Sequence, residues 1–155
     1  MNPHFREVIE TLHPALESLL AMPPVTTLTL PRRMPESGIY LFTERGSHLY
    51  VGRSNRLRSR IRNHGGPSAG ENVASFAFRI ARTDTGNITA SYQVHGSRKD
   101  LLMDPTFLAA FNTAKTRVQR MEVRFVEERN QLKQAVLEIY AAVALGTTFN
   151  DFDTH

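Results

Sequence analysis

The sequence predicts a mixed fold of α-helices and β-strands, and three stretches carry that prediction. Residues 38–42 and 47–52 are short and rich in aromatic and β-branched side chains, and a turn-like segment joins them. Residues 130–146 are long enough for a helix and mostly apolar. Short apolar runs around a turn are typical of a β-hairpin, and a long apolar run is typical of a core helix.

The length of 155 residues and a hydrophobic share of 41% predict one domain, residues 1–155. No stretch approaches the about 18 uninterrupted apolar residues of a membrane span, and charges interrupt the amino terminus where a signal peptide would be apolar. We therefore expect a cytoplasmic protein that does not enter a membrane. Because the sequence contains no cysteine, disulfides, thiol nucleophiles and cysteine-based zinc sites are excluded.

The first 34 residues predict a helical segment and a linker. Apolar residues recur at a helical period up to Leu20, and Pro14 interrupts them, so either one kinked helix or two short ones are expected. A proline-rich stretch follows, and its alternating run from Val25 to Leu30 is typical of a linker or an edge strand.

An insert of helices is predicted in the middle of the chain. Ser68 and Glu71 have the spacing of a capping box, and the apolar period behind them predicts a core helix through residues 68–82. Residues 83–103 contain turn residues and only weak alternation, so they are interpreted as a loop.

A further helix and a third strand should follow the insert loop. Asp104 and Pro105 are typical of the N-cap and the first residue of a helix. The alternation of Met121, Val123 and Phe125 predicts one buried face of a strand.

A dense positive charge lies directly behind the predicted hairpin. Residues 53–64 contain no acid, and their basic residues are Arg53, Arg56, Arg58, Arg60, Arg62 and His64. Ser54 or Asn55 can cap a helix here, with Leu57 and Ile61 on its buried face and with Arg56, Arg60 and His64 as one basic stripe. An arginine-rich helix is usually a solvated face, but uncompensated like charges repel, so an external polyanion is the simpler explanation.

Glu138 is the one charged residue in the apolar run from Ala135 to Leu145, in a helix that Gly146 should end. Its carboxylate is expected to be at least partly buried, and a buried charge is normally neutralised, paired or bound to a metal. A glutamate that faces solvent from the rim of the helix is the alternative, and periodicity does not separate the two.

Six positions in order resemble the GIY-YIG nuclease family: GIY at residues 38–40, YVG at residues 50–52, Arg60, His64, Glu138 and Asn150. The resemblance covers residues 37–151. The sequence departs from the family pattern by valine in the second tripeptide and by a long insert, residues 66–120. The resemblance implies an α+β fold with a small three-stranded antiparallel sheet flanked by helices, to which the amino-terminal segment and the insert are added.

The resemblance also implies a metal-dependent endonuclease that hydrolyses phosphodiester bonds in DNA, with RNA also open. Tyr40 would help deprotonate the attacking water, and Tyr50 would line the same pocket. Arg60 would meet charge on the phosphoryl oxygens, and His64 would extend that site as a donor or proton relay. Glu138 would hold one Mg²⁺ or Mn²⁺, because Mg²⁺ keeps several waters and one carboxylate suffices.

The remaining residues would assist. Gly38 and Gly52 belong to the tripeptides, and Asn150 would support the site near the end of the fold. The other arginines are expected to contact the nucleic-acid backbone. They are Arg53, Arg56, Arg58 and Arg62.

Each of these roles has an ordinary structural alternative. Half-buried tyrosines are common in strands, a histidine at the end of a helix interacts with its dipole, and Asn150 fits a turn. Glu127 and Glu128 are rival metal ligands.

Two other functions also fit the sequence. One is a catalytically silent nucleic-acid-binding module with the same fold, and the other is a regulatory subunit that dimerises through the amino-terminal helix. If the protein cleaves DNA, we expect low sequence specificity, or a homodimer or protein partner that supplies it.

Overall fold

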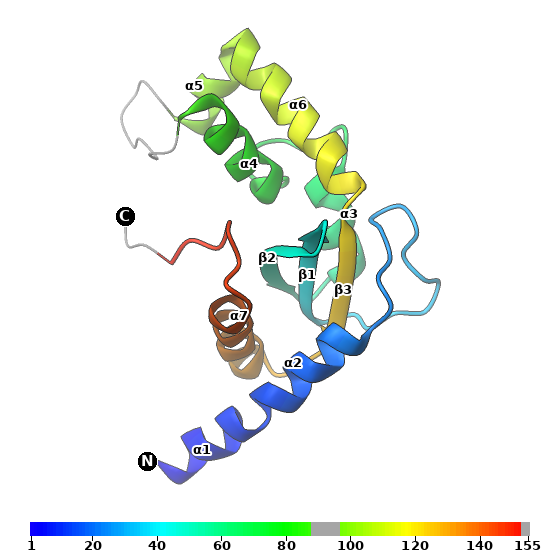
Figure 1. The fold of residues 1–155 in the computed structure, drawn as a ribbon, viewed down its shortest axis with the longest axis vertical. Coiled ribbons are helices and arrows are strands. Elements are labelled where there is room, and N and C mark those ends of the chain that lie inside the picture. Colours follow the sequence, from blue (N-terminus) through cyan, green and yellow to red (C-terminus); the bar gives the residue numbers. More distant parts are fainter. Residues whose placement is uncertain (88–96, 153–155) are drawn as a thin grey trace. The chain divides into compact units, whose positions relative to one another are not determined.

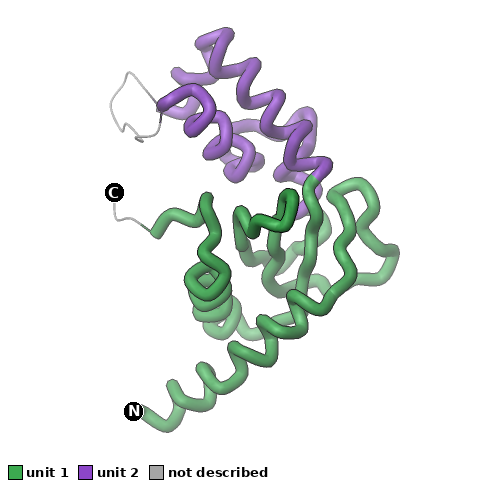
Figure 2. Tube along the Cα trace, in the orientation of Figure 1, with its two compact units in different colours: residues 1–59, 121–155 green, residues 60–120 purple. Residues whose placement is uncertain are grey.

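The computed structural model describes residues 1–87 and 97–152, and these form an α+β fold in which helices flank a small sheet (Figure 1). The chain divides into two compact units (Figure 2). Unit 1 consists of Met1–Ser59 and Met121–His155, and unit 2 consists of Arg60–Arg120.

Unit 1 contains a three-stranded antiparallel sheet, as expected. Its strands are β1 (Gly38–Glu44), β2 (Ser47–Ser54) and β3 (Glu122–Glu127), in the order β2-β1-β3. The hairpin between β1 and β2 turns at Arg45 and Gly46, whose φ angles of 49° and 79° are both positive. Two such residues in succession match the right-handed twist of the paired strands. The predicted hairpin and third strand are thus confirmed.

The amino-terminal segment forms two short helices, α1 (Pro3–Glu10) and α2 (Leu12–Ala21). One of the two alternatives from the sequence is therefore confirmed, but the break lies at Thr11 and not at Pro14. Pro14 falls in the first turn of α2, where a backbone N–H has no partner inside the helix, so its missing donor disturbs nothing.

One face of the sheet packs on α2 and on the last helix, α7 (Gln131–Leu145), and Figure 1 shows both helices beside the strands. Gly146 ends α7 with φ 60°, as the sequence predicted. Each fully buried aliphatic side chain in such a core contributes about 1.5–3 kcal/mol. The shared core consists of Leu12, Leu16, Leu19, Ile39, Leu41, Val51, Leu137 and Ala141.

The linker after α2 follows the outer edge of β3 for one residue pair. Val25 forms an isolated antiparallel bridge with Val123, and the guanidinium of Arg124 donates to the carbonyl oxygen of Met22 at 3.0 Å. The run from Val25 to Leu30 therefore behaves as a linker that touches the sheet edge. No helix within residues 1–87 and 97–152 has the length and apolar character to cross a membrane.

The expected helix at residues 68–82 begins seven residues later than predicted, because α4 spans Ser75–Thr85. The capping box of Ser68 and Glu71 is wrong: residue 74 is the N-cap, and its alanine side chain accepts no hydrogen bond. Gly66, Pro67 and Gly70 favour turns, and the backbone closes short turns there instead of a helix. The apolar period from Phe76 onward is correct, since Phe76, Ala77 and Ile80 are buried.

The predicted loop at residues 83–103 is wrong at both ends. Its first residues continue α4, its last residues form the short helix α5 (Arg98–Met103), and residues 88–96 lie outside the described part of the chain. The following helix, α6 (Pro105–Gln119), is confirmed with its cap, because the carboxylate of Asp104 accepts the N–H of Thr106 at 3.0 Å.

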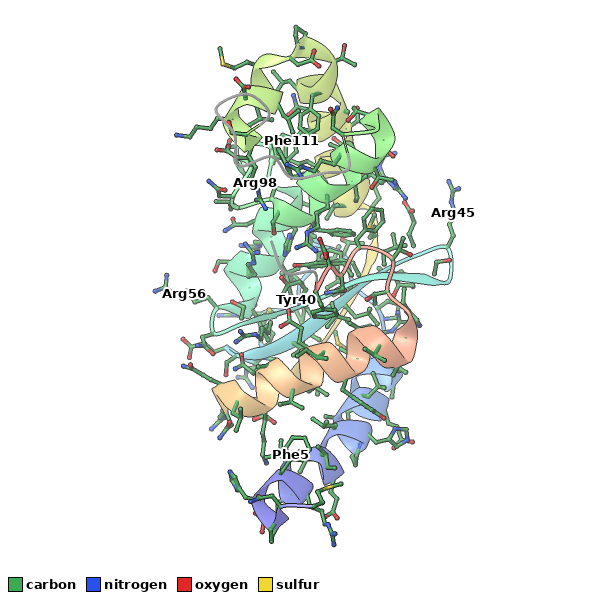
Figure 3. All side chains as sticks on the ribbon, turned by 90° about the vertical axis from the view of Figure 1, so that its left-hand side faces the viewer. Phe5, Tyr40, Arg45, Arg56, Arg98 and Phe111 are labelled. Atoms are coloured by element: carbon green, nitrogen blue, oxygen red, sulfur yellow. The ribbon has the colours of Figure 1, made fainter. Side chains whose placement is uncertain are left out.

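The core of unit 2 is aromatic. The ring of Phe78 on α4 lies 5.1 Å from that of Phe107 and 5.7 Å from that of Phe111, and Figure 3 shows Phe111 among the helices of this unit. These are tilted and edge-to-face geometries, which aromatic pairs prefer. Helices α4 and α6 are thereby held together by rings.

Candidate functional site

The two tripeptides meet in register on adjacent strands. Tyr40 lies opposite Gly52, and Phe42 lies opposite Tyr50. A Cβ atom at position 52 would overlap the hydroxyl and Cζ of Tyr40, so the phenol ring lies directly over the glycine. The glycine of YVG is therefore required by the tyrosine of GIY, a dependence that neither tripeptide shows alone.

The two predicted catalytic tyrosines lie on the same face of the sheet. The ring centroids of Tyr40 and Tyr50 are 6.4 Å apart and the rings are tilted by 51°, while Phe42 contacts Tyr40 edge-on. Tyr40 is 1% exposed and Tyr50 is 9% exposed. Water can therefore reach Tyr50 more readily than Tyr40 in this conformation.

Glu138 is partly buried, as the sequence predicted, and it is paired. Its carboxylate accepts the Nε–H of Arg53 at 3.0 Å, with 23% of the glutamate side chain and 46% of the arginine side chain exposed. Pairing is one of the three outcomes expected for a carboxylate in an apolar helix, and Arg53 is the partner that the sequence left unspecified.

The Arg53–Glu138 ion pair and the tyrosine pair lie on opposite faces of the sheet. Arg53 stands opposite Ile39, whose side chain belongs to the core shared with α7, whereas Tyr40 is the next residue along β1. Successive side chains of a strand point to opposite faces. The structure therefore brings Tyr40 and Tyr50 together and Arg53 and Glu138 together, as two separate groups.

Asn150 supports the second tripeptide through the backbone. Its carbonyl oxygen accepts the N–H of Val51, and its amide donates to the carbonyl oxygen of Val51, each at 2.8 Å. Thr147 donates from its hydroxyl to the same side-chain oxygen, also at 2.8 Å. Val51 is the middle residue of YVG, so the asparagine holds the strand segment that carries Tyr50 and Gly52.

The basic segment does not form the stripe predicted from helical spacing. Its helix, α3 (Leu57–Gly65), begins after Arg56, and the hydroxyl of Ser54 accepts the N–H of Arg56 in the preceding turn at 2.9 Å. His64 is fully buried while Arg56 is exposed, so these two cannot share one solvent face. Leu57 is buried, as expected for the packing face.

The predicted backbone-binding arginines differ in their surroundings. Arg56 extends away from the sheet in Figure 3, and Arg62 is also exposed. By contrast, the guanidinium of Arg58 donates to the carbonyl oxygens of Pro31 and Arg32, which ties the linker to the start of α3. Arg56 and Arg62 therefore present more accessible charge than Arg58.

Arg60 and His64 belong to unit 2 and are held there by its own residues. The guanidinium of Arg60 donates to the carbonyl oxygen of Val73 at 3.0 Å and to the hydroxyl of Ser75 at 3.1 Å. The ring of His64 lies edge-on to Phe76 at 6.2 Å. Burial, and then the charge of Arg60, lower the pKa of His64 well below its ordinary 6.5, so the imidazole is neutral near pH 7.

Sequence reasoning missed Gln134, which connects α7 to the start of the basic segment. Its buried amide donates to the side-chain oxygen of Asn55 at 3.0 Å and to the carbonyl oxygen of Glu128 at 2.7 Å. The available signal was its position one helical turn before Glu138 in a mostly apolar helix.

Glu138 is the residue that the sequence predicted to hold a divalent cation. Within the described residues, no three histidine, aspartate or glutamate side chains are grouped to hold a metal. Glu138 fits Mg²⁺ as a single carboxylate ligand once its ion pair with Arg53 is broken. The rivals are engaged locally, because Glu127 pairs with Arg129 at 2.9 Å and Glu128 accepts the N–H of Asn130 at 2.9 Å.

No protein-family model, curated protein or solved structure matches this chain. The resemblance to GIY-YIG nucleases therefore rests on the six sequence positions and on their contacts in the structure.

Proposed function

We propose that the protein is a metal-dependent endonuclease of the GIY-YIG type that hydrolyses phosphodiester bonds in DNA. The observation that carries the proposal is the pairing of the two tripeptides, with Tyr40 covering Gly52 and Tyr50 beside it. Three sequence positions on two strands thus serve one arrangement of two phenols. Asn150 adds a fourth, because it holds the backbone between Tyr50 and Gly52.

The residue types suit hydrolysis of a phosphodiester, whose negative charge must be screened before water can attack. A Mg²⁺ or Mn²⁺ ion on Glu138 would screen that charge by direct coordination. When Glu138 turns to such an ion, the fork of Arg53 becomes available to phosphate oxygens. Tyr40 and Tyr50 lie on the other face of the sheet from Glu138, so both groups would act on one phosphate only if the substrate reached around the edge strand β2. Tyr50 would then orient the water or the phosphate, and Tyr40 would take up the proton directly or through a relay.

A second candidate is a nucleic-acid-binding module with the same fold and no turnover. The specific observation in its favour is the Arg53–Glu138 ion pair, which occupies the one carboxylate expected to hold the metal and lies across the sheet from the tyrosines. In this case the glutamate serves only to neutralise Arg53.

The test is plasmid nicking by the wild type and by Glu138→Gln in Mg²⁺, Mn²⁺ and EDTA. We expect metal-dependent nicking by the wild type and a loss of at least about a hundredfold in the variant, because metal coordination supplies several kcal/mol of charge stabilisation. Circular dichroism should show that Glu138→Gln folds.

Glu127→Gln and Glu128→Gln are the matched controls, since each removes one carboxylate near the end of β3 and should cleave like the wild type. If Glu138→Gln nicks DNA at the wild-type rate, Glu138 is not the ligand and its rivals must be reconsidered. If the wild type binds DNA and nicks none in any metal, the silent module is correct.

A further inference from the structure

Three of the arginines of unit 2 that the proposed function does not use lie on helices α4 and α5. Arg79 and Arg82 lie three residues apart on α4, so they share a helix face, and Arg98 begins α5. We call these three residues the α4 arginine cluster. All three are partly exposed.

Two members of the cluster lie against one aromatic ring. The Cζ atoms of Arg82 and Arg98 are 5.2 Å and 5.3 Å from the centroid of Phe78. Phe78 is 1% exposed and is fixed by Phe107 and Phe111 in the core of the unit. A cation over a ring face at this distance is held by the ring quadrupole. The guanidiniums are thus oriented by a rigid platform.

The contacts of Arg82 and Arg98 with described residues leave the positive charge of both in place. Arg98 donates to the carbonyl oxygen of Glu71 at 3.1 Å, and a backbone carbonyl carries no net charge. The buried Nε of Arg82 has no hydrogen-bond partner among the described residues. Burial, and then the charges of Arg98 and Arg79, lower the pKa of Arg82, which indicates that both neighbours repel the cation of Arg82.

Unit 2 as a whole also carries a positive net charge. Residues 60–120 contain nine lysines and arginines against four acids, a net charge of +5. The rest of the chain contains ten against eleven, a net charge of −1. The formal positive charge of this protein therefore belongs to unit 2, where it attracts polyanions over a distance of about a Debye length.

We propose that the α4 arginine cluster binds the phosphodiester backbone of a nucleic acid. An anion relieves the repulsion between the guanidiniums, and their planar forks match phosphate oxygens. Because Phe78 already orients two of them, little side-chain entropy is lost on binding. The inference goes beyond the proposed function, since the cluster binds whether or not unit 1 cleaves.

Salt-dependent binding tests the proposal. A fluorescently labelled DNA duplex of random sequence is titrated in EDTA over a series of NaCl concentrations, and a matching RNA duplex is the second probe. Each phosphate contact contributes about 0.9 to the slope of log K against log salt, so Arg82→Gln with Arg98→Gln should flatten it by about two. The control, Arg6→Gln with Arg120→Gln, removes the same charge from exposed positions outside the cluster and should change the slope far less.

Two further measurements do not depend on the stability of the glutamine variant. Arg82→Lys with Arg98→Lys keeps the charge and should keep most of the slope, with weaker binding because the fork is lost. In the wild type, bound duplex should protect Arg82 and Arg98 from phenylglyoxal, read by mass spectrometry, and should leave Arg6 and Arg120 reactive.

A cluster-dependent slope on either duplex supports the proposal. Equal slopes in the folded glutamine variant and the control, or no protection of Arg82 and Arg98, would overturn it. Cluster-dependent binding to anionic phospholipid vesicles, with none to either duplex, would overturn it in favour of a membrane surface. Failure here leaves the cleavage proposal intact, because nicking by Glu138→Gln is read independently of binding in EDTA.

Discussion

Two arginines of unit 1 and two cations of unit 2 have different kinds of partner. In unit 1, Arg53 pairs with the carboxylate of Glu138 at 3.0 Å, and Arg129 pairs with that of Glu127 at 2.9 Å. Each of these pairs cancels its own charge locally, and exposed pairs of this kind contribute little to stability.

In unit 2, the cations of Lys115 and Arg98 contact aromatic rings and backbone carbonyl groups. The Nζ of Lys115 lies 4.6 Å from the centroid of Phe111 and donates to the carbonyl oxygens of Pro67 and Ala69, much as Arg98 uses Phe78 and a backbone oxygen. Neither a ring nor a carbonyl removes the charge. Lys115 and Arg98 are therefore held in position and keep their charge, whereas the charges of Arg53 and Arg129 are balanced by carboxylates.

The largest effect is expected at Arg60, because this residue lies in unit 2 and is proposed to act in the reaction. If it stabilises charge that grows toward the transition state, Arg60→Ala should slow cleavage by about a hundredfold or more while weakening DNA binding much less. The measurements are single-turnover cleavage at saturating enzyme and an equilibrium titration in Ca²⁺. Lysine should rescue only in part, because it lacks the bidentate fork.

Ser75→Ala is the control for Arg60, since it removes the hydroxyl that the guanidinium contacts and keeps the cation. It should retain most of the activity. Equal losses of rate and binding in Arg60→Ala would make Arg60 a contact to the DNA backbone. Arg60 would then have no part in the chemical step.

The close contact of Tyr40 with Gly52 should make unit 1 sensitive to a methyl group at position 52. Gly52→Ala should lower the free energy of unfolding by about 2 kcal/mol or more, because the new methyl group overlaps the phenol ring and the strands must separate. Gly70→Ala in unit 2 places a methyl group in open space and should stay within about 0.5 kcal/mol.

Urea unfolding of both glycine variants, with the slope of free energy against urea compared to the wild type, gives the two values. Similar stabilities for Gly52→Ala and Gly70→Ala would show that Tyr40 can move off the strand at little cost.

Acid should act on unit 2 through His64. The lowered pKa means that the unfolded chain binds a proton at a pH where the folded chain does not, so this stability is complete above pH 6.5 and is lost as the pH falls below it. The expected loss approaches about 1.4 kcal/mol per pH unit. Urea unfolding at a series of pH values measures it.

His64→Gln should flatten this dependence, and it should lower stability most above pH 6.5, where the contribution of His64 is complete. The slope that remains should reflect His48 of unit 1, whose pKa is lowered by burial and then by Arg124, and which contributes with the same sign. An unchanged pH slope in His64→Gln would assign the acid sensitivity to other groups.

Local patterns predicted much of the fold because they repeat within a few residues. The hairpin, the third strand and the helix ending at Gly146 all follow from period and turn residues. The capping box failed because the spacing of Ser68 and Glu71 also occurs in turns, and the neighbouring glycines and proline decided the backbone.

The candidate site was harder to predict, because its contacts join residues far apart in sequence. Glu138 was expected to be paired or metal-bound, but its partner Arg53 lies 85 residues away. Asn150 reaches Val51 across 99 residues. Alternation along a strand identifies which side chains share a face, yet it does not show which face α7 covers.

The hydrogen bonds of Asn150 have a consequence for self-association. Strand β2 is an edge strand of the sheet. The unpaired backbone groups of an edge strand can pair with a second chain, as in domain swapping and amyloid growth. One carboxamide satisfies both backbone groups of Val51, and the N–H of Phe149 occupies the carbonyl oxygen of Leu49 at 2.9 Å. A short segment of irregular chain therefore occupies the edge of β2 at Leu49 and Val51, where an added strand would otherwise pair.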